Sequence, residues 1–282
     1  EAILNSGIMI PDEYIGATRE ETMDRMPDKM FISLKGRSAI YKNELMMLEM
    51  LAYSNWERPL YMATTVGGEN HLNLDPYFVL EGLAYRITPF NWKELGYADQ
   101  DPRTGNYVID TDRMYDNLMA FKFGGLDAGR ELYLDETIRR MCDSHRRLYA
   151  KLAEALIGKG EKDKARDILD KVYYGIPGDV NPHTFVGYSH SMAMSYLELG
   201  DKEKAGDIAE RMAESYFSEM TWYLSLDDYY LRQLSDDFED AATFLYKLVL
   251  PVFERTCKDK ETFNAATDLF DRLYGEYKSR MG

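Results

Sequence analysis

A short pattern that recurs three times in the second half of the chain constrains the fold more than any other feature of the sequence. It reads Ala, any residue, Asp, an aliphatic residue, any residue, an acid, a base and an apolar residue, and its copies begin at Ala165, Ala205 and Ala266. A repeated unit of this kind cannot bury its apolar face alone, so neighbouring units stack around a continuous core. The pattern therefore predicts an α-helical repeat domain over residues 126–282.

Residues around the first copy extend the pattern to the spacing of tetratricopeptide repeats, in which each unit is a hairpin of two helices. The positions that carry this spacing are Tyr149, Leu152, Ala153, Leu156, Ala165, Leu169 and Pro177. Small residues at Ala153 and Ala165 should let two antiparallel helices approach closely, while the large residues fill the grooves between them. Gly158 and Gly160 supply the turn of this predicted hairpin.

The later copies fit this spacing less well. The intervals between them are 40 residues, from 165 to 205, and 61 residues, from 205 to 266, against a tetratricopeptide period of about 34. We attribute the extra residues to a loop around Pro177–Pro182 and to an insertion over about Ser218–Asp240. In the third copy Glu254 stands where a small residue belongs and Pro251 should kink the helix, so we interpret this copy as a diverged capping hairpin.

The first half of the chain predicts a different kind of structure. Scattered Gly and Pro residues make residues 1–29 an irregular segment, and residues 30–125 predict a small α/β unit that ends in a connecting region. The predicted fold class is therefore α+β and mostly helical, with a small N-terminal α/β unit followed by a tetratricopeptide-like helical array.

Individual elements of the α/β unit can be placed by their apolar patterns. A helix at Asn43–Tyr53 has apolar residues in nearly every direction and should be buried on most sides. Runs of strand length follow at Leu60–Val66 and Leu83–Thr88. Between them, Asp75-Pro76 predicts the start of a short helix that Gly82 stops. The many glycines of residues 91–125 are typical of an irregular connection.

The charge of the chain excludes some classes of partner. It carries 34 basic and 49 acidic side chains, a net charge of −15 that is spread along the whole sequence. Nucleic acids are bound largely through Lys and Arg, and anionic membrane faces attract the same residues. We therefore expect no nucleic-acid partner. We expect no direct membrane insertion either, because no apolar run approaches the roughly 20 residues of a membrane span.

Motifs for metal or covalent catalysis are lacking in the sequence. Cys142 and His145 could place two ligands on one helix face, but a zinc site needs three or four. Cys142 and Cys257 cannot form a disulfide framework, and the spacing of a nucleophile elbow or phosphate loop does not occur. We therefore expect no metal and no cofactor, and we identify no catalytic residue.

Glu81 is the acidic residue with the most unusual surroundings, because it lies in the apolar stretch Tyr77–Arg86. A buried Glu needs a partner, and Arg86 and Arg58 are the nearest candidates in the sequence. One interpretation is a buried Glu–Arg pair that pins a helix to a strand. The other is a catalytic carboxylate, which in a glycosidase would work with a second acid across a sugar cleft.

Several motifs resemble a known family. They are Asn43-Glu44-Leu45-Met46, the run from Leu51 to Gly67 with Asn55-Trp56-x-Arg58-Pro59-Leu60-Tyr61, the run from Tyr77 to Pro89 with Glu81-Gly82-Leu83-Ala84-Tyr85-Arg86, and the shorter matches Met114–Leu118, Phe121–Gly125 and Tyr133–Glu136. In these motifs the chain resembles the soluble C-terminal region of large bacterial multi-spanning membrane proteins of unknown function. That family is related to C-type glycosyltransferases and to an animal transmembrane protein O-mannosyltransferase with a tetratricopeptide tail.

The resemblance implies a parent protein that transfers a sugar from a lipid-linked donor to protein, with this chain on the periplasmic side of the inner membrane. In such transferases the catalytic acid lies in a loop between membrane helices, which this chain does not contain. We therefore expect a non-catalytic module, excised from a longer protein, whose partners are its own upstream transmembrane region and an acceptor polypeptide or partner subunit. The candidate binding residues are Asn55, Trp56, Arg58, Tyr61, Glu81, Tyr85 and Arg86.

Two other functions stay open at this point. The chain could be an autonomous carbohydrate-active enzyme that uses paired carboxylates near Glu81, with Trp56, Tyr61 and Tyr85 stacking on sugar. This alternative requires an open cleft with two facing carboxylates. The chain could also be a purely structural cap that orders the membrane half of its parent.

Overall fold

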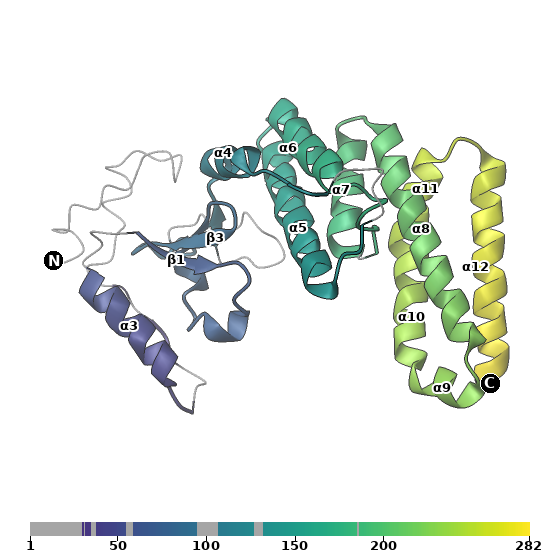
Figure 1. Ribbon diagram of the computed structural model, residues 1–282, viewed down its shortest axis with the longest axis horizontal. Helices are drawn as coiled ribbons and strands as arrows, with labels where there is room; N and C mark the ends of the chain where they lie inside the picture. Colours follow the sequence, from purple (N-terminus) through teal and green to yellow (C-terminus); the bar gives the residue numbers. More distant parts are fainter. Residues whose placement is uncertain are drawn as a thin grey trace. The chain divides into compact units, whose positions relative to one another are not determined.

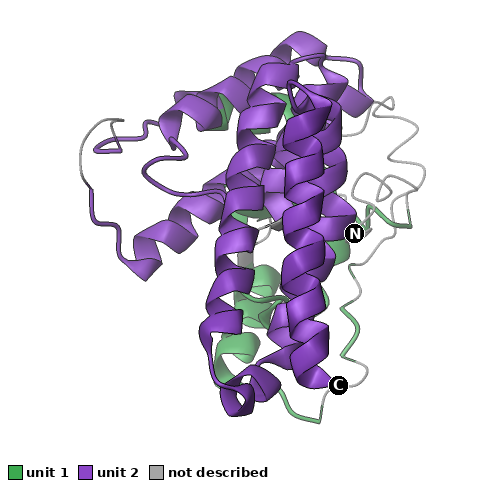
Figure 2. Cartoon of the chain, turned by 90° about the vertical axis from the view of Figure 1, so that its right-hand side faces the viewer, with its two compact units in different colours: residues 1–118 green, residues 119–282 purple. Residues whose placement is uncertain are grey.

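The computed structural model describes residue 30 and residues 32–34, 38–54, 59–94, 107–126, 132–184 and 186–282. Two compact units, residues 1–118 and residues 119–282, divide the chain (Figure 2). The first holds a small sheet and the second is a helical array (Figure 1), which confirms the predicted α+β, mostly helical fold class. None of the helices in the described part of the chain combines the length and apolarity that crossing a membrane requires.

The sheet of the first unit has four short strands in the order β1-β3-β2-β4. Their bounds are β1 Leu60–Ala63, β2 Phe78–Leu80, β3 Ala84–Ile87 and β4 Val108–Ile109. Strand β3 pairs antiparallel with both β1 and β2, whereas β2 and β4 run parallel. All three residues of β2 are fully buried, so β2 forms the centre of this unit's core.

Two expectations about this unit are wrong. The short helix expected from Asp75 to Gly82 is a single 3-10 turn, η3 (Asp75–Tyr77), because the next three residues pair with β3 and β4 as strand β2. Tertiary pairing overrides the local helix signal here. The connecting region expected at residues 91–125 contributes both β4 and a helix, α4 (Thr111–Ala120).

Helix α3 (Lys42–Ser54) forms where a helix was predicted but is much less buried than expected. Among residues 42–53, whose burial the structure describes, only Glu44 and Leu51 are buried. Glu44 accepts a hydrogen bond from the Tyr41 backbone N–H at 2.8 Å, as in half of a capping box. Leu45 and Met46 are exposed by 51% and 53%. The prediction of burial on most sides is therefore wrong, because the unit covers one face of α3 only.

The second unit begins with two antiparallel helical hairpins. Their helices are α5 (Glu136–Gly158), α6 (Lys162–Gly175), α7 (Val186–Glu198) and α8 (Lys202–Ser225). Helix α5 packs on both α6 and α7, and α7 packs on α8. Gly160 and Gly200 make the two turns with φ of 83° and 81°, a backbone conformation that glycine adopts without strain.

Equivalent positions of the two hairpins lie 40 residues apart. Ala153 and Ala193, like Ala165 and Ala205, are at most 1% exposed in the helix contacts. The predicted close approach through small residues is thus confirmed, and the fold is that of a helical repeat.

Arg146 explains the extra loop after α6, because its buried guanidinium donates hydrogen bonds to the carbonyls of Ile176, Asn181 and Pro182 at 3.0, 2.5 and 3.2 Å.

The remaining helices form a third, longer hairpin. They are α9 (Asp228–Gln233), α10 (Ser235–Phe244), the π-helical turn η5 (Leu245–Val249), α11 (Leu250–Thr256) and α12 (Lys260–Met281). Pro251 lies two residues after the end of the π-helical turn, which widens the helix close to where proline removes a backbone donor. Ala266 is only half-buried, unlike Ala165 and Ala205, so the third copy lacks the close helix contact of the first two.

Candidate functional site

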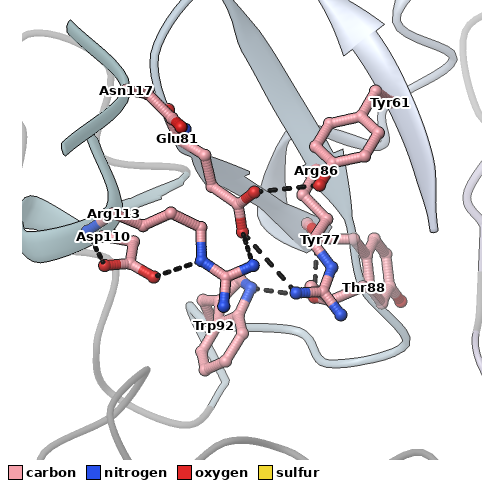
Figure 3. A network of polar contacts seen from close by, with 9 residues as sticks. All are labelled: Tyr61, Tyr77, Glu81, Arg86, Thr88, Trp92, Asp110, Arg113 and Asn117. Atoms are coloured by element: carbon pink, nitrogen blue, oxygen red, sulfur yellow. Dashed lines mark hydrogen bonds and ion pairs between the residues drawn. The ribbon is translucent and has the colours of Figure 1, made fainter. Parts of the chain in front are cut away.

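Strand register brings three of the predicted site residues to one face of the sheet. Tyr61 of β1 and Val79 of β2 both pair with Arg86 of β3, and residues that pair across strands point to the same side. Glu81 follows Val79 by two residues and therefore shares this face. Figure 3 shows Tyr61, Glu81 and Arg86 converging there.

Glu81 is the centre of the resulting polar network and is only 4% exposed. The Tyr61 hydroxyl donates a hydrogen bond to Glu81 Oε2 at 3.0 Å. Two guanidinium groups, those of Arg86 and Arg113, place Nη1 at 3.6 and 3.8 Å from Glu81 Oε1. The buried carboxylate is therefore held by one hydroxyl and two positive charges (Figure 3).

Helix α4 supplies the other half of the network. Because β4 runs parallel to β2, the carboxyl ends of the two strands meet, and the Asp110 backbone N–H donates to the Leu80 carbonyl at 3.1 Å. Asp110 Oδ1 accepts from the Arg113 backbone N–H at 3.0 Å, as an N-cap does. Asn117, one turn further on, donates from Nδ2 to the Glu81 carbonyl at 2.6 Å.

Burial shifts the pKa values of two groups in this network. Burial raises the pKa of Asp110 above its usual range, against the opposing effects of the Arg113 backbone N–H and guanidinium. Burial and the neighbouring Glu81 charge raise the pKa of Tyr61, so its hydroxyl stays protonated and remains a donor. Arg113 bridges the two acids, with Nε at 3.7 Å from Asp110 Oδ2.

Such an arrangement suits structural anchoring better than acid–base catalysis. A glycosidase needs two carboxylates that face a substrate and reach water. Glu81 and Asp110 are 4% and 8% exposed, and one arginine bridges them. The network instead connects strands β1, β2 and β3 to helix α4.

Tyr85 lies on the opposite face from Arg86, since neighbouring residues of a strand alternate sides. Its ring stacks on Phe78 with a centroid separation of 5.1 Å and meets the edge of Tyr107 at the same distance. On this face Tyr85 therefore packs among aromatic side chains. Asn55, Trp56 and Arg58 lie outside the described residues.

Sequence reasoning missed Asp110, Arg113 and Asn117. Arg86 lies five residues after Glu81, but Arg113 is 32 residues away and joins it only through the parallel pairing of β2 and β4. A signal was present, because Asp110 follows the apolar run Tyr107–Ile109 and precedes a helix in the position of an N-cap.

A strained turn lies close to this sheet in the chain. Leu72 and Asn73 have φ of 54° and 59°, in the left-handed region that residues other than glycine rarely adopt. Asn73 donates from Nδ2 to the Ser33 carbonyl at 2.6 Å. His71, beside them, faces two acceptors, with Nδ1 at 2.7 Å from Asp75 Oδ1 and Nε2 at 3.1 Å from the Val66 carbonyl. These contacts hold the strained turn in place.

In the second unit, the Cys142 and His145 pair behaves as ordinary packing. Cys142 is buried, and burial raises the pKa of its thiol. Burial also lowers the pKa of His145, whose ring contacts Phe121 and Phe123 at centroid separations of 4.6 and 5.4 Å. Within the described residues, no three His, Cys, Asp or Glu side chains gather as a metal site would require.

A cavity of about 360 Å³ lies in the second unit, between the start of α8 and the turn that joins α11 to α12. Acidic and basic side chains both line its wall, together with the free thiol of Cys257. Asp207 and Lys258 are examples of this mixed lining. The wall carries four acidic and two basic side chains, so its net negative charge disfavours an anion.

Comparison with known protein families matches part of the first unit to a family model. Residues 10–106, which are 97 of the 282 residues, match the family model described as TMEM260-associated domain 2. The matched range includes α3 and strands β1 to β3. This similarity fits a domain of a TMEM260-like membrane protein family. Searches of curated proteins and of solved structures found no significant match.

Proposed function

We propose that this chain is a non-catalytic accessory module of a TMEM260-like membrane glycosyltransferase and works on the periplasmic side of the membrane. In this proposal the first unit seats the module on the upstream transmembrane region of its parent. The helical array of the second unit binds an acceptor polypeptide or a partner subunit.

The observation that carries the proposal is the match of residues 10–106 to a domain associated with TMEM260. TMEM260 is related to protein O-mannosyltransferases, which act on polypeptides. A surface that binds polypeptides suits a module attached to such a protein. The burial of Glu81 and its ion pair with Arg86 support a non-catalytic role for the first unit.

The second unit offers features that suit polypeptide binding. Helical repeats expose extended surfaces for partners because each hairpin adds to the next. Large aromatic side chains are exposed on this unit: Trp222 by 54%, Tyr229 by 67%, Tyr230 by 56% and Tyr246 by 57%. Tyr and Trp are enriched where proteins bind each other because they combine apolar area with a polar group.

Titration of the purified chain with peptides tests the proposal. The probes are fluorescent Ser/Thr-rich peptides taken from extracytoplasmic proteins, and binding is followed by fluorescence polarisation. We expect saturable binding that the double substitution Trp222→Ala, Tyr230→Ala weakens at least tenfold. Tyr133→Ala is the matched control, because Tyr133 is 91% exposed and precedes the repeat array. Absence of saturable binding across the panel would refute the proposal.

The geometry does not favour the carbohydrate-active alternative. That function needed an open cleft with two facing carboxylates near Glu81 and sugar-stacking aromatics that include Tyr85. Glu81 is buried and held by Arg86 and Arg113, and Tyr85 stacks on Phe78 on the other face of the sheet.

A further inference from the structure

Helix α3 has a large apolar surface that its own unit leaves exposed. Met46, Met50 and Tyr53 are exposed by 53%, 57% and 86%, and Tyr41, just before the helix, by 68%. Together with Leu45 they form a continuous apolar surface along the helix, which we call the α3 face. An exposed patch of this kind marks a site of interaction.

Two charges in the middle of the α3 face indicate what covers it. Lys42 and Glu49 are exposed and lie seven residues apart, so they share the same side of the helix, about two turns from each other. Charged side chains at the centre of an apolar surface oppose its burial in a bilayer. They suit a protein partner that presents the opposite charges in the same order.

A second copy of this helix presents that order. Consider two α3 helices that run antiparallel about a two-fold axis between Leu45 and Met46. Two residues then face each other across the axis when their residue numbers add up to 91. Lys42 then faces Glu49 of the second copy, and Glu49 faces its Lys42. The same axis places Leu45 against Met46 of the second copy, so apolar residues surround the two-fold axis. Such a self-complementary surface is what a two-fold symmetric interface requires.

We infer that this protein forms a homodimer through antiparallel pairing of α3 with α3 of a second copy. Each dimer contains two Lys42–Glu49 ion pairs and an apolar contact built from Leu45, Met46, Met50 and Tyr41. The surface is locally neutral, with one positive and one negative charge, although the chain as a whole carries −15. Two copies can therefore approach there without the repulsion that operates elsewhere.

The size of the contact sets the expected strength. A helix of 13 residues is about 20 Å long, so one helix pair is a small interface. Small interfaces give weak and reversible association. We therefore expect a dimer that forms with increasing concentration and weakens with salt, because salt screens the attraction between Lys42 and Glu49 in so small an interface.

Charge reversal distinguishes this specific antiparallel pairing from non-specific association of apolar surfaces. The measurement is sedimentation velocity over a range of concentrations. Lys42→Glu and Glu49→Lys should each weaken the homodimer at least tenfold, because each variant places four like charges together. A mixture of the two variants should form a heterodimer, and the double variant Lys42→Glu, Glu49→Lys should recover the homodimer.

Control variants separate the effect of α3 pairing from changes in folding or in total charge. Glu214→Lys, an exposed site on α8 with the same change in charge, should leave the association unchanged. Met46→Glu should give a monomer with the circular dichroism of the original chain, because its side chain is exposed.

Three results would overturn the inference. The chain could remain monomeric at all concentrations tested, or the single charge reversals could dimerise as well as the original chain. Alternatively, the chain could sediment with phosphatidylcholine vesicles through Met46 while remaining monomeric, which would make a lipid surface the occupant of the α3 face.

Discussion

The two units are stabilised in different ways. In the second unit, equivalent positions of the first two hairpins lie 40 residues apart, and the small residues Ala165 and Ala205 fill the same place in each. In the first unit, residues far apart in the sequence meet around the buried carboxylate of Glu81. Regular packing spreads stability over many similar contacts, whereas a central charge makes a few contacts essential. The comparison predicts which substitutions affect each unit and by how much.

Arg146→Ala should give the largest effect, because it removes a fully buried charge from the repeat array. The buried carbonyls of Ile176 and Asn181 would lose the donor that Arg146 supplies, while the Pro182 carbonyl would keep its hydrogen bond from the Thr184 backbone N–H; we expect a loss of about 3–5 kcal/mol in the free energy of unfolding. Chemical denaturation followed by circular dichroism measures this loss. The adjacent Arg147 is exposed, so Arg147→Ala should change stability by less than about 0.5 kcal/mol. Equal effects would contradict the account.

Glu81→Gln should destabilise the first unit by about 2 kcal/mol, because Arg86 and Arg113 both lose the charge of Glu81, although Arg113 keeps its ion pair with Asp110. The value is below that of a fully buried pair because Arg86 and Arg113 are partly exposed. Hydrogen exchange followed by mass spectrometry should show faster exchange in β1 to β3 and unchanged exchange in α5 to α8. Glu94→Gln, at an exposed position, is the control. Uniform acceleration in both units would argue against the division.

Tyr196→Phe sharpens the comparison within the repeat array. Its hydroxyl donates to Asp170 at 2.8 Å, and we expect a loss of about 1 kcal/mol near neutral pH. Burial, together with Asp170, raises the pKa of Tyr196 above its ordinary value of 10.0. The stability that un-ionised Tyr196 contributes is therefore complete below pH 10 and is lost as the pH rises from there towards the folded-state pKa.

The Tyr196→Phe variant should consequently lose less stability than the original chain above pH 10. Denaturation midpoints measured between pH 8 and pH 11 test this difference in slope. Tyr133→Phe, at a position 91% exposed, should follow the original chain at every pH. Parallel curves for Tyr196→Phe and the original chain would contradict the assigned cause.

Met46→Ser should have the smallest effect on folding, within about 0.5 kcal/mol, because its side chain is half exposed on α3. Leu51→Ala, on the covered side of the same helix, should cost about 2 kcal/mol. Thermal unfolding at a protein concentration below dimer formation compares the two variants. A large loss from Met46→Ser would mean that the first unit covers α3 after all.

The sequence predicted what depends on local pattern. The helical hairpins, their small contact residues Ala153 and Ala165, and the turn at Gly160 all follow from spacing along the chain. The same reasoning could name Arg86 as a partner of Glu81, because the two are near each other in the sequence. It could not find Arg113, because strand pairing between β2 and β4 brings that residue close only in the folded chain.

Two further errors have physical causes. Local composition indicated burial of α3, but burial depends on the surface available to cover a helix, and the described unit covers one face. The predicted helix after Asp75 gave way to β2 because Phe78 to Leu80 gained strand partners on both sides. Both cases depend on tertiary partners, which no window of the sequence contains.

The central claim is that the first unit's buried charge is structural and that the second unit binds polypeptide. Peptide affinity measured by fluorescence polarisation in three proteins tests it most directly: the original chain, Glu81→Gln, and Trp222→Ala with Tyr230→Ala. At a temperature where all three are folded, the account predicts equal affinity for the original chain and Glu81→Gln, and at least tenfold weaker binding for the aromatic double variant. Loss of binding in Glu81→Gln with full binding in the aromatic variant would contradict it.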